Sequence, residues 1–312
     1  MAHADSQVGA ERLADAASRP SSPLIDAMPL VFVLIWATGF IVARYGMPHA
    51  PPMKFLAVRY ALSVVCFVAW ALLARVSFPT SREQWFHLAV TGVLMHAVYL
   101  GGVWSAVKLG MGAGLTSLLV ALQPVLTAIW LSHRGGQVSR EQWAGLALGL
   151  AGLVMVVWAK LGIGEISTGS LACALTALLG ITAGTLYQKR HVAPCDVRTA
   201  NLIQLAAALA VTVPLASLEA EPLRWGSVSA PNLELAGAMA WSVLGMTLGG
   251  SSLLYLLIQR GAATSVASLF YLVPPTTALL AWLLFGEAIT TLTILGTLLT
   301  AAGVGLVVRR RA

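Results

Sequence analysis

Long apolar runs separated by short polar connections fill the chain from residue 27 to residue 308. A helix of about 20 apolar residues is long enough to cross the hydrocarbon core of a bilayer. The pattern predicts ten such spans, which are 27–45, 53–74, 85–107, 112–131, 141–159, 168–188, 199–218, 235–258, 264–285 and 289–308. The runs are longer than β-barrel strands and lack their alternation, so we expect an all-α membrane protein.

The composition supports this fold class. Hydrophobic residues make up 58% of the chain and charged residues only 10%, whereas soluble domains carry about 25% charged residues. Every Asp and Glu lies in the polar amino-terminal tail or near the end of an apolar run, because a charge at the bilayer centre costs at least about 2.5 kcal/mol. The three cysteines lack metal-binding spacing and indicate apolar fillers rather than disulfides. We expect no metal and no cofactor.

The distribution of Lys and Arg predicts the orientation. Residues 1–26 are polar, lack the layout of a signal peptide and are expected to form a disordered cytoplasmic tail. With this tail inside, the predicted cytoplasmic segments hold thirteen Lys and Arg residues and the outer segments hold five. This excess predicts a multi-pass protein of a bacterial inner (plasma) membrane with both termini cytoplasmic. The net charge of +7 then reflects membrane topology, and we expect no nucleic-acid partner.

An internal repeat relates the two halves of the chain. At a shift of 151 residues, residues 110–158 lie over 261–309 without a gap, and Gly110 meets Gly261 while Pro124 meets Pro275. At a shift near 145, Gly39 falls on Gly184 and Arg59 on Gln204. The sequence therefore predicts two five-helix repeats, 27–159 and 160–312. Because five is odd, the second repeat is inverted, an arrangement typical of transporters with a central cavity at the midplane.

Short motifs in both halves resemble one transporter family. They are Trp36-Ala37-Thr38-Gly39-Phe40, Phe55 to Tyr60, Gly112 to Leu118 with Gln123-Pro124, Ala262 to Ser268, Pro274-Pro275 and Leu284 to Glu287. In this order they resemble the EamA-type family of the drug/metabolite transporter superfamily, and within it bacterial exporters of amino acids, including aromatic ones. The resemblance implies a ten-helix basket around a central cavity. One departure is Gly135-Gly136, where the family often has Gly-Glu, so this loop is expected to differ in shape.

His96 is the first candidate for a substrate-binding residue. It lies near the centre of the third predicted span, with Tyr99 three residues further on. An ionisable side chain at that depth normally faces the bundle interior or a wet cavity. The alternative is a neutral histidine bonded to a neighbouring helix.

Arg59 lies about two turns into the second span. Such a cation either holds a substrate carboxylate through a bidentate contact or extends to the interface as a helix anchor. Its repeat mate Gln204 is also polar, so this position is a candidate bridge between helices in both halves.

The remaining candidates are a glutamine and four aromatic residues. Gln123 precedes Pro124 and is positioned to bond either substrate or a neighbouring helix. Trp36, Trp241, Tyr255 and Tyr271 lie inside or near the ends of spans. They suit a planar or apolar substrate side chain, although Trp and Tyr also favour membrane interfaces.

We therefore expect a carrier that exports small metabolites, namely aromatic or other neutral amino acids, by alternating access through the midplane cavity. Other metabolites or drugs handled by the same superfamily remain the alternative. No nucleophile elbow or HExxH spacing is present, which disfavours a membrane enzyme. No Asp or Glu lies mid-span, so transport is either uncoupled or uses His96 as its titrating group. The expected partners are the small-molecule substrate and the bilayer, with the oligomeric state open.

Overall fold

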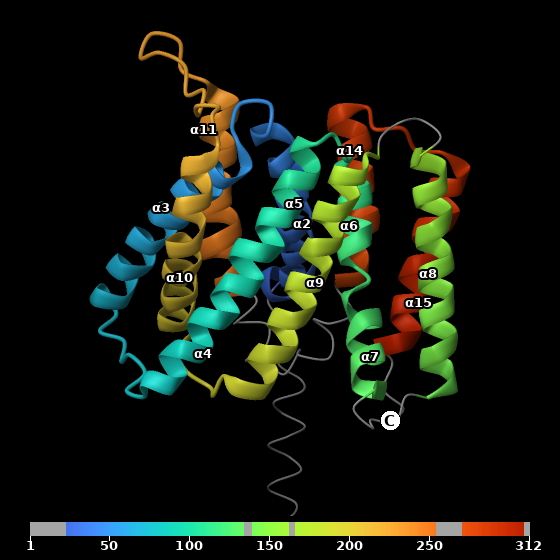
Figure 1. Ribbon diagram of the computed structural model, residues 1–312, viewed down its shortest axis with the longest axis horizontal. Helices are drawn as coiled ribbons and strands as arrows, with labels where there is room; N and C mark the ends of the chain where they lie inside the picture. Colours follow the sequence, from blue (N-terminus) through green and yellow to red (C-terminus); the bar gives the residue numbers. More distant parts are fainter. Residues whose placement is uncertain (1–22, 134–138, 162–165, 254–269, 309–312) are drawn as a thin grey trace, which may run out of the picture.

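The computed structural model describes residues 23–133, 139–161, 166–253 and 270–308 (Figure 1). Within these ranges the chain is helical, and the only β pairing is an isolated bridge between Gly226 and Pro231. Seven helices of the described residues are long and apolar enough to cross a membrane. The prediction of an all-α membrane protein is confirmed at this level.

Residues 27–159 contribute the first set of helices. They are α2 (Pro23–Gly46), α3 (Pro52–Leu73), α4 (Arg82–Gly92), η1 (Val93–Val98), α5 (Tyr99–Lys108), α6 (Ala113–Val120), α7 (Gln123–His133) and α8 (Arg140–Leu161). The elements α4, η1 and α5 follow one another without a break and form the third predicted span. The fourth span is interrupted at residues 121–122, just ahead of Pro124, whose ring nitrogen carries no hydrogen for an intrahelical bond.

Residues 160–312 contribute the second set. They are α9 (Thr168–His191), α10 (Val197–Leu218), α11 (Leu233–Ala240), η2 (Trp241–Gly250), η4 (Phe270–Leu272), α14 (Val273–Phe285) and α15 (Thr291–Val308). The eighth predicted span is described as α11 and η2, and its last residues lie outside the described ranges. The start of the ninth span lies outside them too. The predicted count of ten spans therefore extends beyond what the structure describes.

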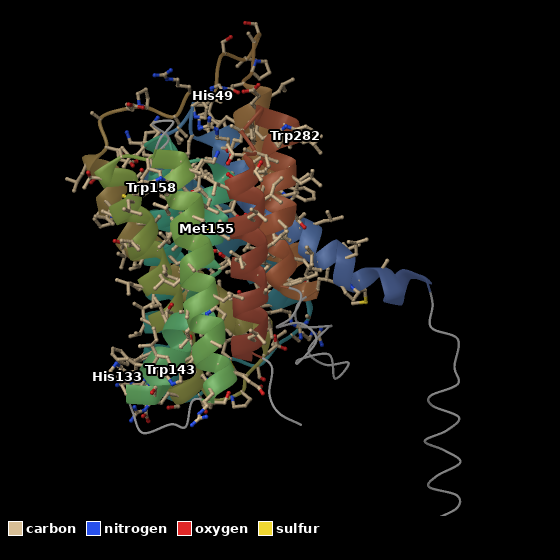
Figure 2. The ribbon with its side chains drawn as sticks, turned by 90° about the vertical axis from the view of Figure 1, so that its right-hand side faces the viewer. His49, His133, Trp143, Met155, Trp158 and Trp282 are labelled. Carbon is tan, nitrogen blue, oxygen red and sulfur yellow. The ribbon has the colours of Figure 1, made fainter. Side chains whose placement is uncertain are left out.

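The helices form an upright bundle with two ends (Figures 1 and 2). Helix α3 packs on α10, α5 on α9, α14 on both α2 and α6, and α8 on α15 at the edge of the bundle. Figure 2 shows His49 at one end and His133 at the other, and we call these the His49 end and the His133 end. Trp158 and Trp143 lie toward opposite ends and are 74% and 50% exposed, as expected for residues of the aromatic belts.

The packing of α8 on α15 is reciprocal. A Cβ on Gly152 would meet the carbonyl oxygen of Gly296, and a Cβ on Gly303 would lie 2.5 Å from the carbonyl oxygen of Gly145. Glycine lets two membrane helices approach this closely. At the shift of 151 residues, Gly152 corresponds to Gly303 and Gly145 to Gly296, so each contact is the repeat mate of the other.

A second reciprocal contact joins a glycine to a methionine in each half. A Cβ on Gly39 in α2 would lie 2.7 Å from Met246 Cε in η2. A Cβ on Gly184 in α9 would lie 2.5 Å from Met95 Cγ in η1. Gly39 and Gly184 correspond at the shift of 145, and Met95 and Met246 at the shift of 151. The two contacts therefore involve equivalent residues with the halves exchanged.

Candidate functional site

Two π-helical segments occupy equivalent places in the halves. Segment η1 (Val93–Val98) carries His96 and η2 (Trp241–Gly250) carries Thr247, and the shift of 151 places His96 on Thr247. Thr247 Oγ1 donates to the carbonyl oxygen of Ser242, five residues earlier, at 2.8 Å. A π-helix is rare and is frequently found at functional sites. The side chains on and next to these two segments are therefore candidates for a functional site.

Arg59 reaches η2 from α3. Its Nη2 and Nε donate to Thr247 Oγ1 at 3.2 and 3.4 Å, and both residues are only 7% exposed. Within the described part of the chain, Thr247 Oγ1 is the only acceptor hydrogen-bonded to the guanidinium, and no carboxylate pairs with it. A helix anchor would extend its side chain out of the bundle. The burial of Arg59 instead leaves a cation inside the bundle.

His96 and two tyrosines lie beside this cation. Tyr60 Oη donates to the carbonyl oxygen of His96 at 2.8 Å, and their rings meet edge to face with centroids 6.1 Å apart. The side chain of Gln204 in α10 lies close enough to the His96 ring to interact with it. Tyr60 and Tyr99, which are 0% and 9% exposed, lie near enough to Arg59 to interact with its charge. The structure thus brings together the predicted residues Arg59, His96 and Tyr99.

Four of these residues form repeat-related pairs. Arg59 corresponds to Gln204, and His96 corresponds to Thr247. The contact of Arg59 with Thr247 is therefore the repeat mate of the contact of Gln204 with His96. We call Arg59, His96, Gln204 and Thr247 the polar quartet.

The other predicted site residues have different neighbours. Trp241 Nε1 donates to Thr38 Oγ1 at 2.8 Å, and Gln123 Nε2 donates to Thr185 Oγ1 at 2.8 Å. The Trp36 ring contacts Phe270 with centroids 5.3 Å apart. Tyr255 and the side chain of Tyr271 lie outside what the structure describes.

Two pockets lined by described residues lie at the ends of the bundle. One of about 450 Å³ is at the His133 end, where the α3–α4 and α9–α10 connections meet, and it is lined by Glu83, His87 and His191 among others. Another, of about 20 Å³, lies between Lys160 and Glu287 at the opposite end. No predicted substrate residue lines either pocket. The central cavity therefore stays a prediction.

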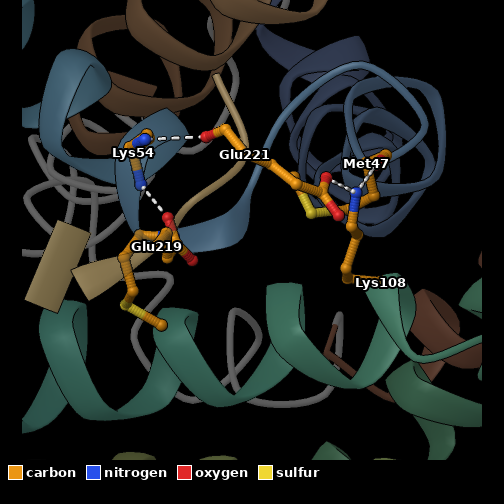
Figure 3. Close-up of polar contacts among 6 residues, drawn as sticks. Met47, Lys54, Lys108, Glu219 and Glu221 are labelled. Atoms are coloured by element: carbon orange, nitrogen blue, oxygen red, sulfur yellow. Dashed lines mark hydrogen bonds and ion pairs between the residues drawn. The ribbon is translucent and has the colours of Figure 1, made fainter. Parts of the chain in front are cut away.

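At the His49 end, glutamates of the second half hold the first half (Figure 3). Helix α3 begins after Pro51, which supplies no capping side chain. Glu219 takes this role, because its carboxylate accepts from the backbone nitrogens of Met53 and Lys54 at 2.9 and 2.8 Å. Glu221 accepts from Lys108 Nζ at 3.1 Å. A carboxylate at a helix N-terminus satisfies free N–H groups and complements the helix dipole.

Helix α6 is capped in the same way. It begins after Gly112, which has no side chain to offer. Glu287 accepts from the backbone nitrogens of Ala113 at 2.8 Å and Gly114 at 3.4 Å. We call the contacts of Glu219 and Glu287 the trans-caps, since each comes from residues 160–312 and caps a helix of residues 27–159.

Comparisons with known proteins agree with this architecture. A model of the EamA-like transporter family matches residues 24–158 and again residues 168–309. A probable amino-acid metabolite efflux pump of Salmonella typhimurium is 26% identical over 295 residues, covering 91% of this chain and 96% of that protein. The uncharacterized inner membrane transporter YedA of Escherichia coli K12 is 27% identical over 261 residues, covering 83% and 81%.

A solved crystal structure superposes with a TM-score of 0.61 at 18% identity, covering 89% of this chain and 94% of its own. At that identity the likeness concerns the fold alone. The two family matches span nearly all of the apolar helices. This multi-pass membrane protein therefore belongs to the EamA-like transporter family.

Proposed function

We propose that the protein exports amino acids and their small derivatives across a bacterial inner membrane, by alternating access between two inverted five-helix repeats. The observation that carries the proposal is the polar quartet, in which a buried cation and a histidine lie in repeat-related contacts. Two similar proteins, of Salmonella typhimurium and Escherichia coli K12, are named probable amino-acid metabolite efflux pumps, which supports the substrate class.

Three pairs of reciprocal contacts support the inverted repeat. They lie between α8 and α15, between the glycines and methionines of α2, η1, α9 and η2, and within the polar quartet. The double match to the family model supports the same division of the chain. In inverted-repeat transporters the substrate binds near the midplane, where the halves meet.

In this proposal Arg59 anchors the substrate carboxylate, and His96 and Tyr99 contribute hydrogen bonds. An Arg–carboxylate pair is often bidentate and is roughly twice as strong as a neutral hydrogen bond. Trp36, Trp241, Tyr255, Tyr271 and Gln123 line the path of the substrate side chain. His96 is the proposed titrating group if transport is coupled to protons.

The His49 end is proposed as the outer end, as the excess of Lys and Arg in the segments at the other end predicts. The trans-caps then close the outer side. The residues that correspond to Glu219 and Glu287 at the shifts of 145 and 151 are Ala74 and Gly136, which carry no carboxylate. The trans-caps therefore distinguish the outer side from the inner side, where the halves are joined by other contacts such as the two hydrogen bonds between Gln84 and Ala193.

Purified protein in liposomes tests the proposal. We expect saturable counterflow of labelled aromatic or neutral amino acids or their derivatives, and at least a tenfold loss of flux in Arg59→Gln. Arg44→Gln is the matched control, because it removes an equal charge that lies 6.0 Å over the Phe285 ring, away from the quartet. The proposal fails if none of these solutes moves saturably, or if Arg59→Gln transports like Arg44→Gln. Substrate turnover without flux would indicate an enzyme.

A further inference from the structure

The predicted spans contain a buried positive charge, on Arg59, but no acidic residue at their centres that could balance it. Arginine stays protonated in proteins, and Arg59 is buried with a threonine hydroxyl as its acceptor. None of the twelve acidic residues of the sequence lies in the middle of a predicted span. This holds for residues 254–269 as well, which contain no Asp or Glu. The site thus has one fixed positive charge and no fixed negative charge.

A buried charge without a partner is costly, since desolvation is not offset by a pair. The bound substrate is the remaining source of a counter-charge. A carboxylate supplies it, and binding then converts an isolated cation into an ion pair. A ligand without a negative charge leaves the cost in place.

A charged amino group on the ligand would lie beside a positive charge and would find no negative charge to pair with. In a free amino acid the ammonium is attached one carbon from the carboxylate, so a carboxylate on Arg59 brings it close to the guanidinium. The residues around it, Tyr60, Tyr99, His96, Gln204 and Thr247, include no acid. The carbonyl oxygen of His96, a candidate acceptor for an ammonium, already accepts from Tyr60 Oη. In a site of low dielectric the two positive charges repel strongly.

We infer that the site prefers monoanionic amino-acid derivatives whose amino group is uncharged, such as N-acyl amino acids, over zwitterionic free amino acids. The inference rests on the proposed function and specifies the ligand of the same site. Arg59 is the residue that determines the preference.

The test compares matched solutes in liposomes that contain the full-length protein. One pair is N-acetyl-L-phenylalanine with L-phenylalanine, and a second is N-acetyl-L-leucine with L-leucine. The expected kcat/KM for counterflow is at least about tenfold higher for the acetylated member of each pair, which corresponds to about 1.4 kcal/mol. In Arg59→Gln the ratio falls to about one, and in Arg59→Lys, which keeps the charge, it stays above one. Arg44→Gln keeps the ratio of the unmodified protein.

The outcomes separate the two proposals. If the free amino acids move saturably and as fast as their acetylated partners, the inference is wrong and the proposed function stands. If none of the four solutes moves saturably, the proposed function fails and the inference fails with it. The ratio measured on the unmodified protein decides between these results even if Arg59→Gln does not fold, because it requires no variant.

Discussion

Removing the carboxylate of Glu219 should open the His49 end. The carboxylate accepts from two backbone N–H groups of α3, at 2.9 and 2.8 Å. Loss of a capping side chain costs about 1 kcal/mol, and loss of a negative charge at a helix N-terminus about 0.3–1 kcal/mol. Glu219→Ala therefore removes about 1.4 kcal/mol from the closed state, and a difference of that size changes a two-state ratio about tenfold.

The assay is a distance distribution between spin labels on the two halves. Leu109 at the end of α5 and Val228 in the α10–α11 connection are 51% and 104% exposed, so cysteines there accept labels without disturbing the core. The native cysteines 66, 173 and 195 are free and are replaced first. In Glu219→Ala the ratio of long to short distances should rise about tenfold over the parent protein.

Asp196→Asn is the matched control for Glu219→Ala. Asp196 caps α10 at the opposite end, where it accepts from the backbone nitrogen of Arg198 at 2.8 Å. It removes a negative charge at a helix N-terminus, as Glu219→Ala does, while the Asn side chain still accepts from the backbone of α10, so the distance distribution should stay that of the parent. If Glu219→Ala leaves the distribution unchanged, or Asp196→Asn shifts it equally, the trans-cap is not a gate.

Three further predictions concern stability in detergent, read as the midpoint of thermal unfolding. Gly152→Ala should lower the midpoint, because its Cβ would lie 2.6 Å from the backbone nitrogen of Thr300. Such overpacking costs about 1–3 kcal/mol of folding stability. Gly237→Ala, with nothing within 4 Å, should not lower it. Tyr60→Phe should cost about 0.5–1.5 kcal/mol by removing the hydrogen bond from the hydroxyl to the His96 carbonyl, and an unchanged midpoint would contradict this. Hydrogen bonds from Arg198 lower the pKa of Asp196, so its contribution is present above its ordinary pKa of about 3.9. The gap between the parent protein and Asp196→Asn should therefore shrink as the pH falls below about 4, and a gap that grows would refute the assignment.

The helices could be predicted from the sequence because a bilayer imposes a strong pattern. Runs such as 168–188 contain no charge, and α9 covers this run. The π-helical form of η1 and η2 could not be predicted, since one inserted residue in a helix leaves the hydrophobic pattern nearly unchanged. The break before Gln123 follows from Pro124, although its position two residues earlier depends on packing.

Some residues of the candidate site could be predicted from the sequence. His96 and Arg59 stand out because ionisable residues are rare in apolar runs. Thr247 carries no such signal and is found only through its register with His96 at the shift of 151. Trp241 and Gln123 were chosen by residue type, and their hydrogen bonds to Thr38 and Thr185 depend on helix packing that a pattern does not specify.

The trans-caps were not predictable either, because the cap of α3 comes from a residue 166 positions further along the chain. In the proposed inverted repeat, they give a physical reason for a preferred direction. Two identical halves would close the two ends equally well, so a preference must come from positions where repeat mates differ. The carboxylate of Glu219 accepts from the start of α3, whereas the corresponding residue Ala74 has no side-chain acceptor for the start of α10.

Adding the missing carboxylate should therefore reverse part of the bias. Ala74 directly follows α3, and the start of α10 is near, since Arg198 Cζ lies 5.8 Å from the Trp70 ring centroid. Ala74→Glu should stabilise the closed form of the His133 end by about 0.3–1 kcal/mol. The long-distance population at the His49 end then rises about two- to fivefold at fixed temperature. Ala74→Gln controls for side-chain length without charge. A rise in both variants, or in neither, would mean that carboxylates at mated positions do not set the balance between the two ends.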